Sequence, residues 1–408
     1  MHRRLALLAA GAPSLLAGAI AAQEARPPEA ADLFRQVIPN PTGKNGYEDL
    51  VLAAQLYSRS RHKPAVDQGR LTLTERRRVL ADASLRRVQQ LIRQGISRPV
   101  TSPREKLDFT TLLPEFAHFR SLARLLMIEQ YVLLADGRIP DAIQASRVFL
   151  RFAQVIQTDT LISGLVGIAI SSMGIRGLGD HLDQLSFRDC DLLYRTCLEW
   201  LAQPTALPRM IETEQRAGRE FLATMAQQFR ARGLGFLKDM GLDSPDAASQ
   251  DLLRRAQADP LFLDNLARDS ARRLDRFYDD LRVELRKPLW EQKLPEVGED
   301  GSFAATLARQ FLPAFTSVVH RYGEAAARVR ILGCHAAIRR YRWETQSPPA
   351  TLAGLRLGDL AIDPFNGAPL QYEVRGTRYR LSSVGSPAKE DDPQAVNGRR
   401  PVTVGPDF

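Results

Sequence analysis

Apolar residues recur every three to four positions through most of this chain, and this period predicts amphipathic α-helices. The first two helices are expected over residues 74–94, with Thr74 as the N-cap, and over residues 114–137. Gly95 follows the first and Gly137 ends the second, and glycine is the residue that most often follows a helix end. The pattern therefore predicts a mainly α-helical protein. Further helices are expected over residues 140–156, 159–185, 186–200, 208–232, 244–256, 260–289 and 303–343.

Local signals add detail to this helical pattern. Ser186 and Asp189 have the spacing of a capping box, and small residues such as Gly164 and Gly167 allow neighbouring helices to approach closely. The join at residues 135–143 resembles the short turn inside tetratricopeptide repeats. The full repeat pattern and its 34-residue period are missing, which favours an irregular helical bundle over a repeat solenoid.

The pattern changes after residue 343, where a small antiparallel sheet is expected. Asn366-Gly367 favours a tight turn, and apolar residues then alternate with polar ones at 370–374 and 379–381. Gly376-Thr377 between these two runs is the expected hairpin turn. The sequence therefore predicts a long helix packed on a small sheet, which together form an α+β lobe.

The N-terminus has the features of an export signal. Arg3 and Arg4 precede an apolar stretch at residues 5–20, and Ala19 and Ala21 are small residues of the kind that a signal peptidase requires. An uncleaved membrane anchor is the alternative. The next most apolar segment, residues 160–175, is interpreted as a buried helix, so no transmembrane span is expected after signal cleavage. These features predict an exported protein, either periplasmic or extracellular.

Residues 22–70 are rich in Pro, Gly and Asn and are interpreted as a linker with one short helix around residues 47–57. The predicted organisation has five parts. These are a signal peptide (1–21), an irregular N-terminal linker (22–70), a helical domain (71–300), a long helix with a small antiparallel sheet (301–392) and a tail (393–408).

The C-terminal run resembles the globular domain of type II secretion major pseudopilins. The match covers residues 325–392 and rests on an ordered set of motifs. The set is Tyr341-Arg342-Trp343, Pro348-Pro349, Asp363-Pro364-Phe365-Asn366-Gly367 and Ser383-Val384-Gly385. The pseudopilin leader is absent. The whole chain is also similar to exported, helix-rich bacterial proteins of unknown role, a resemblance that implies no activity.

The pseudopilin resemblance implies a calcium site, because acidic residues after the Ser-x-Gly segment bind calcium in that family and calcium prefers several oxygen ligands. Here Pro387 stands where the first acidic ligand is expected, and only Glu390, Asp391 and Asp392 follow. Asp391 and Asp392 are therefore the candidate calcium ligands. No other cofactor is expected.

The composition excludes a largely disordered chain, since 44% of the 408 residues are hydrophobic and 25% are charged. The formal net charge is +9, and Arg76, Arg77 and Arg78 concentrate part of it on one predicted helix. Nucleic-acid binding is not expected, because no aromatic residues are interleaved with these basic groups. A solvated helix face is the favoured interpretation, while an anionic envelope surface or polymer remains a permitted partner.

The three cysteines are poorly placed for a disulfide. Cys190 and Cys197 are seven positions apart on a predicted helix, about 10 Å at 1.5 Å per residue, which exceeds disulfide reach. Cys334 could pair with one of them and leave the other free. Buried, unreactive thiols are the favoured state for all three.

No catalytic constellation is evident in the sequence. Glu115 and His118 have the i,i+3 spacing of a di-iron helix, but no second Glu-x-x-His motif accompanies them. Asp180-His181 has no nucleophile or third member. The sequence therefore predicts a non-catalytic envelope or extracellular protein that binds a protein or a surface. Two alternatives remain: a secreted hydrolase whose acids converge only in the fold, and a diverged accessory component of a type II secretion system. The hydrolase candidates are Glu115, Glu129, Asp136 and Asp180.

Overall fold

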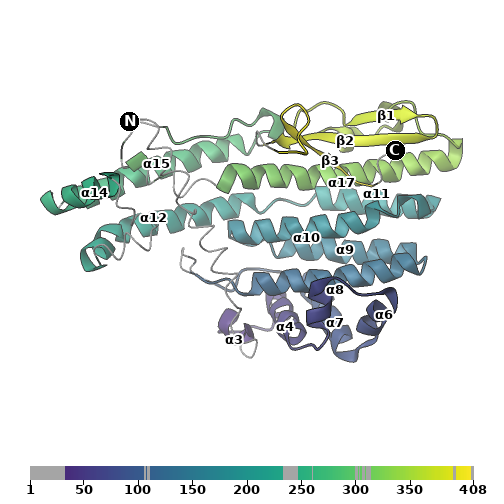
Figure 1. The fold of residues 1–408 in the computed structure, drawn as a ribbon, viewed down its shortest axis with the longest axis horizontal. Coiled ribbons are helices and arrows are strands. Elements are labelled where there is room, and N and C mark those ends of the chain that lie inside the picture. The colour runs from purple at the N-terminus through teal and green to yellow at the C-terminus, as the bar shows by residue number, and fades with distance from the viewer. Residues whose placement is uncertain are drawn as a thin grey trace.

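The computed structural model is mainly helical, with a small antiparallel sheet near the C-terminus, as the sequence predicts (Figure 1). Its described residues are 33–104, 107, 111–232, 247–259, 261–298, 302, 304–305, 308, 314–388 and 392–405. The proposed signal peptide therefore lies outside the described residues.

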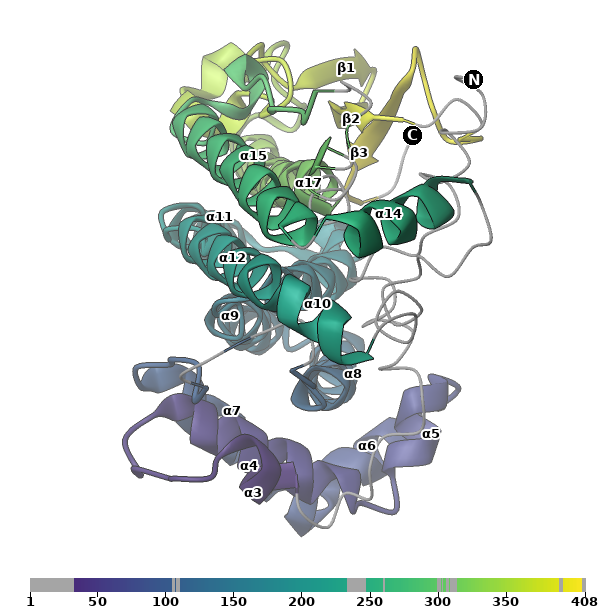
Figure 2. The ribbon, with the colours of Figure 1, turned by 90° about the vertical axis from the view of Figure 1, so that its left-hand side faces the viewer.

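Five short helices form an N-terminal layer, residues 33–104, beneath the central helices (Figure 2). Tyr47 and Leu50 of this layer are buried in one hydrophobic cluster with Phe116 and Phe119 of the central helix α8 (Glu115–Ala135). The short helix expected around residues 47–57 is confirmed as α4, but from residue 33 onward the segment around it is packed structure and not a linker. The helices are α3 (Leu33–Val37), α4 (Gly46–Ser58), α5 (Lys63–Gln68), α6 (Leu73–Ala81) and α7 (Ala83–Ser97).

The helix expected over residues 74–94 is two helices, α6 and α7. Thr72, rather than Thr74, caps α6 through a capping box with Glu75. Asp82 has an extended backbone conformation and caps α7, which breaks the helix at that point. Gly95 lies inside α7 instead of ending it. Its missing side chain leaves room for the backbone of Gly46. Helix periodicity alone did not reveal this break, since Asp82 is compatible with a continuous helix.

Four longer helices form the centre of the molecule, and their predicted positions are confirmed within a few residues. They are α8 (Glu115–Ala135), α9 (Ile139–Val155), α10 (Leu161–Gly179) and α11 (Phe187–Leu201). The Ser186–Asp189 capping box of α11 is present. The helix expected to reach residue 185 stops at Gly179, and the 3-10 turn η2 (Leu182–Gln184) follows it. Gly167 allows the expected close approach, since an added Cβ would lie 2.5 Å from the carbonyl oxygen of Ala153.

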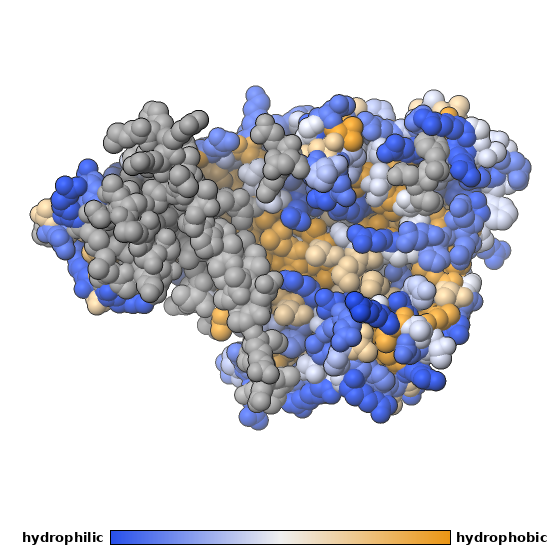
Figure 3. Space-filling model, in the orientation of Figure 1, coloured by the Kyte–Doolittle hydropathy of each residue, from blue (hydrophilic) through white to orange (hydrophobic). Residues whose placement is uncertain are grey.

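Among the described residues, one helix, α10, is long and apolar enough to cross a membrane. Within the fold, 61% of its most apolar 18-residue stretch is buried. This burial agrees with its interpretation as a core helix. The side of α10 that is not fully buried includes the half-buried Leu165 and Met173 and the exposed Ala169. Figure 3 shows apolar residues gathered in the middle of the molecule in this view.

The following helices extend the molecule to one side and pack around a third hydrophobic cluster (Figure 1). Tyr278 and Phe315 meet edge to face within it, with ring centroids 5.4 Å apart. The helices are α12 (Leu207–Arg232), α14 (Ala247–Ala258) and α15 (Phe262–Glu284), and the 3-10 turn η3 (Leu289–Glu291) comes after them.

The C-terminal lobe consists of the long helix α17 (Ala314–Thr345) and a three-stranded antiparallel sheet of order β1-β2-β3. The predicted hairpin is confirmed: Tyr372 pairs with Leu381, and Gly376 lies in the turn with φ of 63°. Two 3-10 turns, η4 (Leu352–Leu355) and η5 (Gly358–Ala361), connect α17 to the sheet. The strands are β1 (Gln371–Arg375), β2 (Arg378–Pro387) and β3 (Arg399–Thr403).

Strand β3 lies in the segment that the sequence predicts to be a tail. Its sequence, RRPVT, contains a proline and lacks a clear alternation of apolar and polar residues. It pairs with β2 across a bulge between Ser383 and Ser386. Gly385 in this bulge has φ of 75°, and an added Cβ would lie 1.7 Å from the carbonyl oxygen of Arg400. Glycine is therefore required where β3 joins the sheet.

A second hydrophobic cluster joins the central helices to the C-terminal lobe. It contains Cys197 of α11 and Ile338 of α17, and the sheet adds Leu381 and Val402; Val404, just beyond β3, also belongs to it. The boundary expected at residue 300 therefore does not separate two hydrophobic cores.

Candidate functional site

Glu115 serves the fold rather than a metal. Its carboxylate is completely buried and accepts hydrogen bonds from the Tyr47 hydroxyl (2.8 Å) and the Arg104 guanidinium (2.9 Å). Burial and the neighbouring Glu115 raise the pKa of Tyr47. These contacts occupy both carboxylate oxygens and tie α4 and the loop after α7 to the start of α8.

His118 is not paired with Glu115 around a metal site. Burial, together with the charge of Lys63, lowers its pKa. The nearby carboxylate of Asp67 is already bound by Lys63 (2.6 Å), Arg124 (3.1 Å) and Ser121 (3.3 Å). Within the part of the chain that the structure describes, no group of three or more His, Cys, Asp or Glu side chains could hold a metal ion.

Three of the acids proposed for a hydrolase belong to α8 or its end and do not form one site. Glu115 and Asp136 are separated by almost the whole of α8, roughly 30 Å at 1.5 Å per residue. Glu129 is paired with Arg93 and Asp136 with Arg77. The fourth acid, Asp180, is exposed at the C-terminal end of α10.

The structure describes one of the two calcium candidates. Asp392 accepts a hydrogen bond from the backbone nitrogen of Gln394 (2.9 Å) and lies 3.8 Å from Nε of Arg400. Asp391 lies outside the described residues. The calcium site therefore stays a prediction.

The cysteines are buried and free, as favoured by their spacing. Burial raises the pKa of Cys190 and of Cys334 to about 12, and it raises the pKa of Cys197 as well. All three thiols are therefore protonated at neutral pH. Such thiols are poor nucleophiles.

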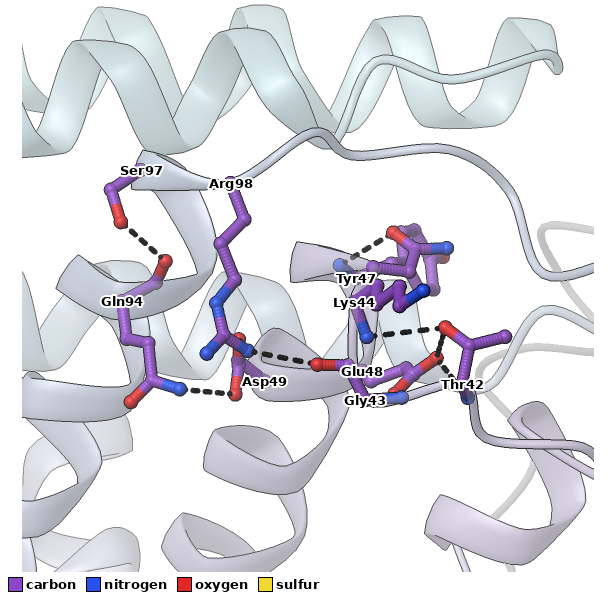
Figure 4. Close-up of polar contacts among 10 residues, drawn as sticks. Thr42, Gly43, Lys44, Tyr47, Glu48, Asp49, Gln94, Ser97 and Arg98 are labelled. Atoms are coloured by element: carbon purple, nitrogen blue, oxygen red, sulfur yellow. Dashed lines mark hydrogen bonds and ion pairs between the residues drawn. The ribbon is translucent and has the colours of Figure 1, made fainter.

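Two acids that the sequence did not single out, Glu48 and Asp49, are buried at the start of α4 (Figure 4). Thr42 and Gly43 donate hydrogen bonds of 2.8 Å to Glu48. Burial opposes ionisation, but these hydrogen bonds outweigh it, so the pKa of Glu48 is lowered. Asp49 accepts a hydrogen bond of 3.1 Å from the side chain of Gln94 in α7. It accepts a second, of 2.9 Å, from Arg98 just beyond α7.

Burial raises the pKa of Asp49, and the Arg98 guanidinium opposes this rise. Both carboxylates are therefore occupied by contacts within the fold. This cluster fixes the loop at residues 42–45 to α4 and α4 to α7.

Glu214 of α12 is the carboxyl group with the largest upward shift among the acids whose pKa values are resolved. Burial raises its pKa to about 7, although the backbone nitrogen of Leu161 donates a hydrogen bond to it at 3.1 Å. Among the described residues no Lys or Arg forms an ion pair with Glu214. A carboxyl group of this kind is a candidate acid–base group, but the contacts of Glu214 include no nucleophile.

A groove of about 430 Å³ lies between α9 and α11, with Ile96 of α7 at one edge. Ligand pockets in proteins are typically about 300–1,000 Å³. Polar residues at helical spacing on α9 face polar and aromatic residues of α11 across it. The polar and aromatic lining residues include Gln144, Arg147, Arg151 and Gln154 of α9, and Glu199 and Trp200 of α11.

The charges of this groove are unequal. Arg147 forms an ion pair with Glu199 at 2.7 Å, which neutralises the acidic group of the lining. Arg151 is exposed and has no hydrogen-bond or ion-pair partner in the described parts of the chain. The groove therefore carries one unpaired positive charge.

The indole of Trp200 has an unused donor. Its Nε1 atom is buried without a hydrogen-bond partner, while its backbone carbonyl accepts from Gln154 at 3.2 Å. A buried N–H group without a partner is costly, typically about 1–3 kcal/mol, so such groups are uncommon in folded proteins. The groove is therefore lined by the ring of Trp200, and its buried N–H group is not part of the accessible surface.

The groove does not have the groups that covalent catalysis needs. Its one hydroxyl, on Thr196, donates to the carbonyl of Leu192 at 2.9 Å, and its lining contains no His, Cys or Asp. The sequence did not single out this groove, because Arg147 and Arg151 have the spacing of an ordinary solvated helix face. Only the packing of Trp200 beside them creates a concave surface.

Searches of protein-family models, curated proteins and solved structures gave no significant match to this chain. The resemblance of its C-terminal lobe to pseudopilins therefore stays a prediction.

Proposed function

We propose that this protein is an exported, non-catalytic binding protein that holds a small ligand, or a short stretch of a polymer, in the groove between α9 and α11. The observation that carries this proposal is the unpaired guanidinium of Arg151 beside the aromatic ring of Trp200 in one concave surface. Export rests on the N-terminal pattern of Arg3, Arg4 and the apolar stretch after them.

The lining supports binding in preference to catalysis. The acids suggested for a hydrolase are dispersed, and each of Glu115, Glu129 and Asp136 is held by an arginine. The groove instead offers charged, amide and aromatic side chains around an open volume. Such a mixture of apolar lining and a few polar groups is typical of ligand sites.

A thermal-shift screen tests the proposal. The purified chain is tested against neutral sugars, acidic sugars, amino acids and short peptides, with Arg151→Glu and Trp200→Phe as groove variants. Arg120→Glu is the matched control, because Arg120 is also exposed on a helix but does not line the groove.

A ligand that raises the Tm of the parent chain and of the control, but not of the groove variants, supports the proposal. If every stabilising compound acts equally on Arg151→Glu and Trp200→Phe, or if none stabilises the parent chain, the groove is not the binding site.

A further inference from the structure

We propose that the ligand of the α9–α11 groove is a carboxylated sugar, such as a uronate unit of an acidic polysaccharide. This inference rests on the proposed function, since it names the chemical class that the same groove would take. It follows from four features of the groove: its charge, its donors, the position of its backbone and its apolar surface.

The charge selects an acidic ligand. Glu199 is already paired with Arg147, so a ligand meets the exposed guanidinium of Arg151 as the remaining charge of the groove. A guanidinium presents two parallel N–H groups that match the two oxygens of a carboxylate. A neutral ligand would leave the charge of the Arg151 guanidinium without a partner.

The donors select a ligand that is rich in oxygen. The side-chain amide of Gln144 lines the groove, is exposed and has no hydrogen-bond partner among the described residues. Amide groups both donate and accept, which suits the hydroxyl groups of a sugar.

The backbone makes a phosphate a poorer fit. Phosphate sites typically use free backbone N–H groups at a helix N-terminus or in a glycine-rich loop. Residues 144–154 lie inside α9 and residues 196–200 inside α11, so their N–H groups are used in the helices. The ligand is therefore bound by side chains.

The apolar part of the lining favours a sugar over a helical peptide. Peptide helices bind through apolar stripes that fill hydrophobic grooves. Here Gln144, Arg147 and Arg151 of α9 interrupt the apolar lining, which consists of Ile96, Val148, Leu150 and the ring of Trp200. An aromatic ring beside polar groups suits a sugar, which has an apolar C–H face and polar edges.

Isothermal titration calorimetry of the purified chain with trigalacturonate tests this inference. The comparison probes are neutral galactotriose, triglutamate and inorganic phosphate. We expect trigalacturonate to bind at least tenfold more tightly than galactotriose, and its affinity to fall as the salt concentration rises. Triglutamate and phosphate should bind at least tenfold more weakly than trigalacturonate.

Variants locate the site. Arg151→Ala should weaken trigalacturonate binding at least tenfold, Arg151→Lys should restore part of it, and Trp200→Phe should weaken it about three- to tenfold by reducing the aromatic surface against the sugar. Arg120→Ala should leave the affinity unchanged. Because Arg151 is exposed, its variants should keep the parent Tm, so a loss of binding reports on the groove and not on folding.

The outcomes separate this inference from the proposed function. Binding of galactotriose, triglutamate or phosphate at the groove, with equal or higher affinity than trigalacturonate, overturns the assignment of an acidic sugar and leaves the groove as a binding site. Trigalacturonate binding that is insensitive to Arg151→Ala also overturns the assignment.

Discussion

The N-terminal layer and the C-terminal lobe bury polar side chains by different means. In the N-terminal layer buried carboxylates face arginines: Arg104 binds Glu115, and Arg98 binds Asp49. In the C-terminal lobe, the imidazole of His335 ties α17 to the sheet through the uncharged Tyr379 hydroxyl and Val404 carbonyl, while the charge of Asp183 raises its pKa only in part. The first arrangement depends on both charges being present, whereas the second depends on one group remaining uncharged.

The hydrogen bonds of His335 define its protonation. Its Nε2 lies 2.7 Å from the carbonyl oxygen of Val404, which can only accept, so Nε2 carries the proton. Its Nδ1 then accepts from the Tyr379 hydroxyl at 2.8 Å. Burial lowers the pKa of His335 to about 4, so the ring is neutral at physiological pH. The two regions should therefore respond differently to mutation and to acid.

The largest effect is expected from Arg104→Ala in the N-terminal layer. This change leaves the completely buried Glu115 carboxylate with the Tyr47 hydroxyl as its remaining described side-chain partner. Breaking a buried ion pair from one side typically costs about 3–5 kcal/mol, so the free energy of unfolding in urea should fall by that amount. Arg98→Ala, at a pair whose arginine is more exposed, should cost about 1 kcal/mol. Equal losses from the two variants would contradict this account.

Acid should weaken the C-terminal lobe. The pKa of His335 is about 4 in the fold and about 6.5 in an unfolded chain. The fold therefore keeps its full stability above pH 6.5 and loses about 3 kcal/mol as the pH falls to 4. Hydrogen exchange of the amides in β3, corrected for the intrinsic effect of pH, should show this loss. His335→Gln should abolish the pH dependence, and a β3 that is equally protected at pH 6.5 and 4 in the parent chain would be the opposite result.

Glu214→Gln should sharpen the comparison, because the stability contributions of Glu214 and His335 change with pH in opposite directions. Its pKa of about 7 lies above the usual value of 4.5, so the folded state keeps the proton longer than the unfolded state does. The contribution of Glu214 to the free energy of unfolding is therefore lost as the pH rises from 4.5 to 7. The substitution should add about 3 kcal/mol to the free energy of unfolding at pH 8 and nothing near pH 4.

Urea unfolding at pH 8 and pH 4 measures this effect. Glu212→Gln is the control, since Glu212 lies on the same helix and is exposed. In the Glu214→Gln variant the acid sensitivity of the C-terminal lobe should become more visible in global unfolding. No gain at pH 8 would show that the carboxyl of Glu214 is solvated.

The smallest effect concerns the cap of α6. Thr72→Ala should lower the free energy of unfolding by about 1 kcal/mol, because Thr72 caps the helix through Glu75. Thr74→Ala should change it by less than about 0.5 kcal/mol, because Thr74 is exposed inside the helix. Chemical denaturation of the two variants distinguishes the cap in the structure from the cap that the sequence predicted.

The sequence predicted the elements that local chemistry determines. Ser186 and Asp189 specified the start of α11, and Gly376 specified the turn between β1 and β2. The apolar stripes of α8 and α9 were long enough to be identified by their period alone. In these cases the signal lies within a few residues of the element that it specifies.

The remaining features depend on contacts between distant segments. Tyr47 lies in a segment rich in Pro and Gly, and its burial requires Glu115, 68 positions away. Strand β3 depends on Gly385 for its pairing, and the groove depends on Trp200 packing beside α9. No local pattern encodes these contacts, so the linker, the tail and the site could not be predicted correctly from the sequence.

The position of Val404 has a consequence for the order of events during folding. Its carbonyl accepts from His335, and its side chain lies in the hydrophobic cluster that contains all three cysteines. That cluster is therefore complete only after residue 404 has been synthesised. A chain interrupted before this residue would lack the last apolar side chain of the core that contains its thiols.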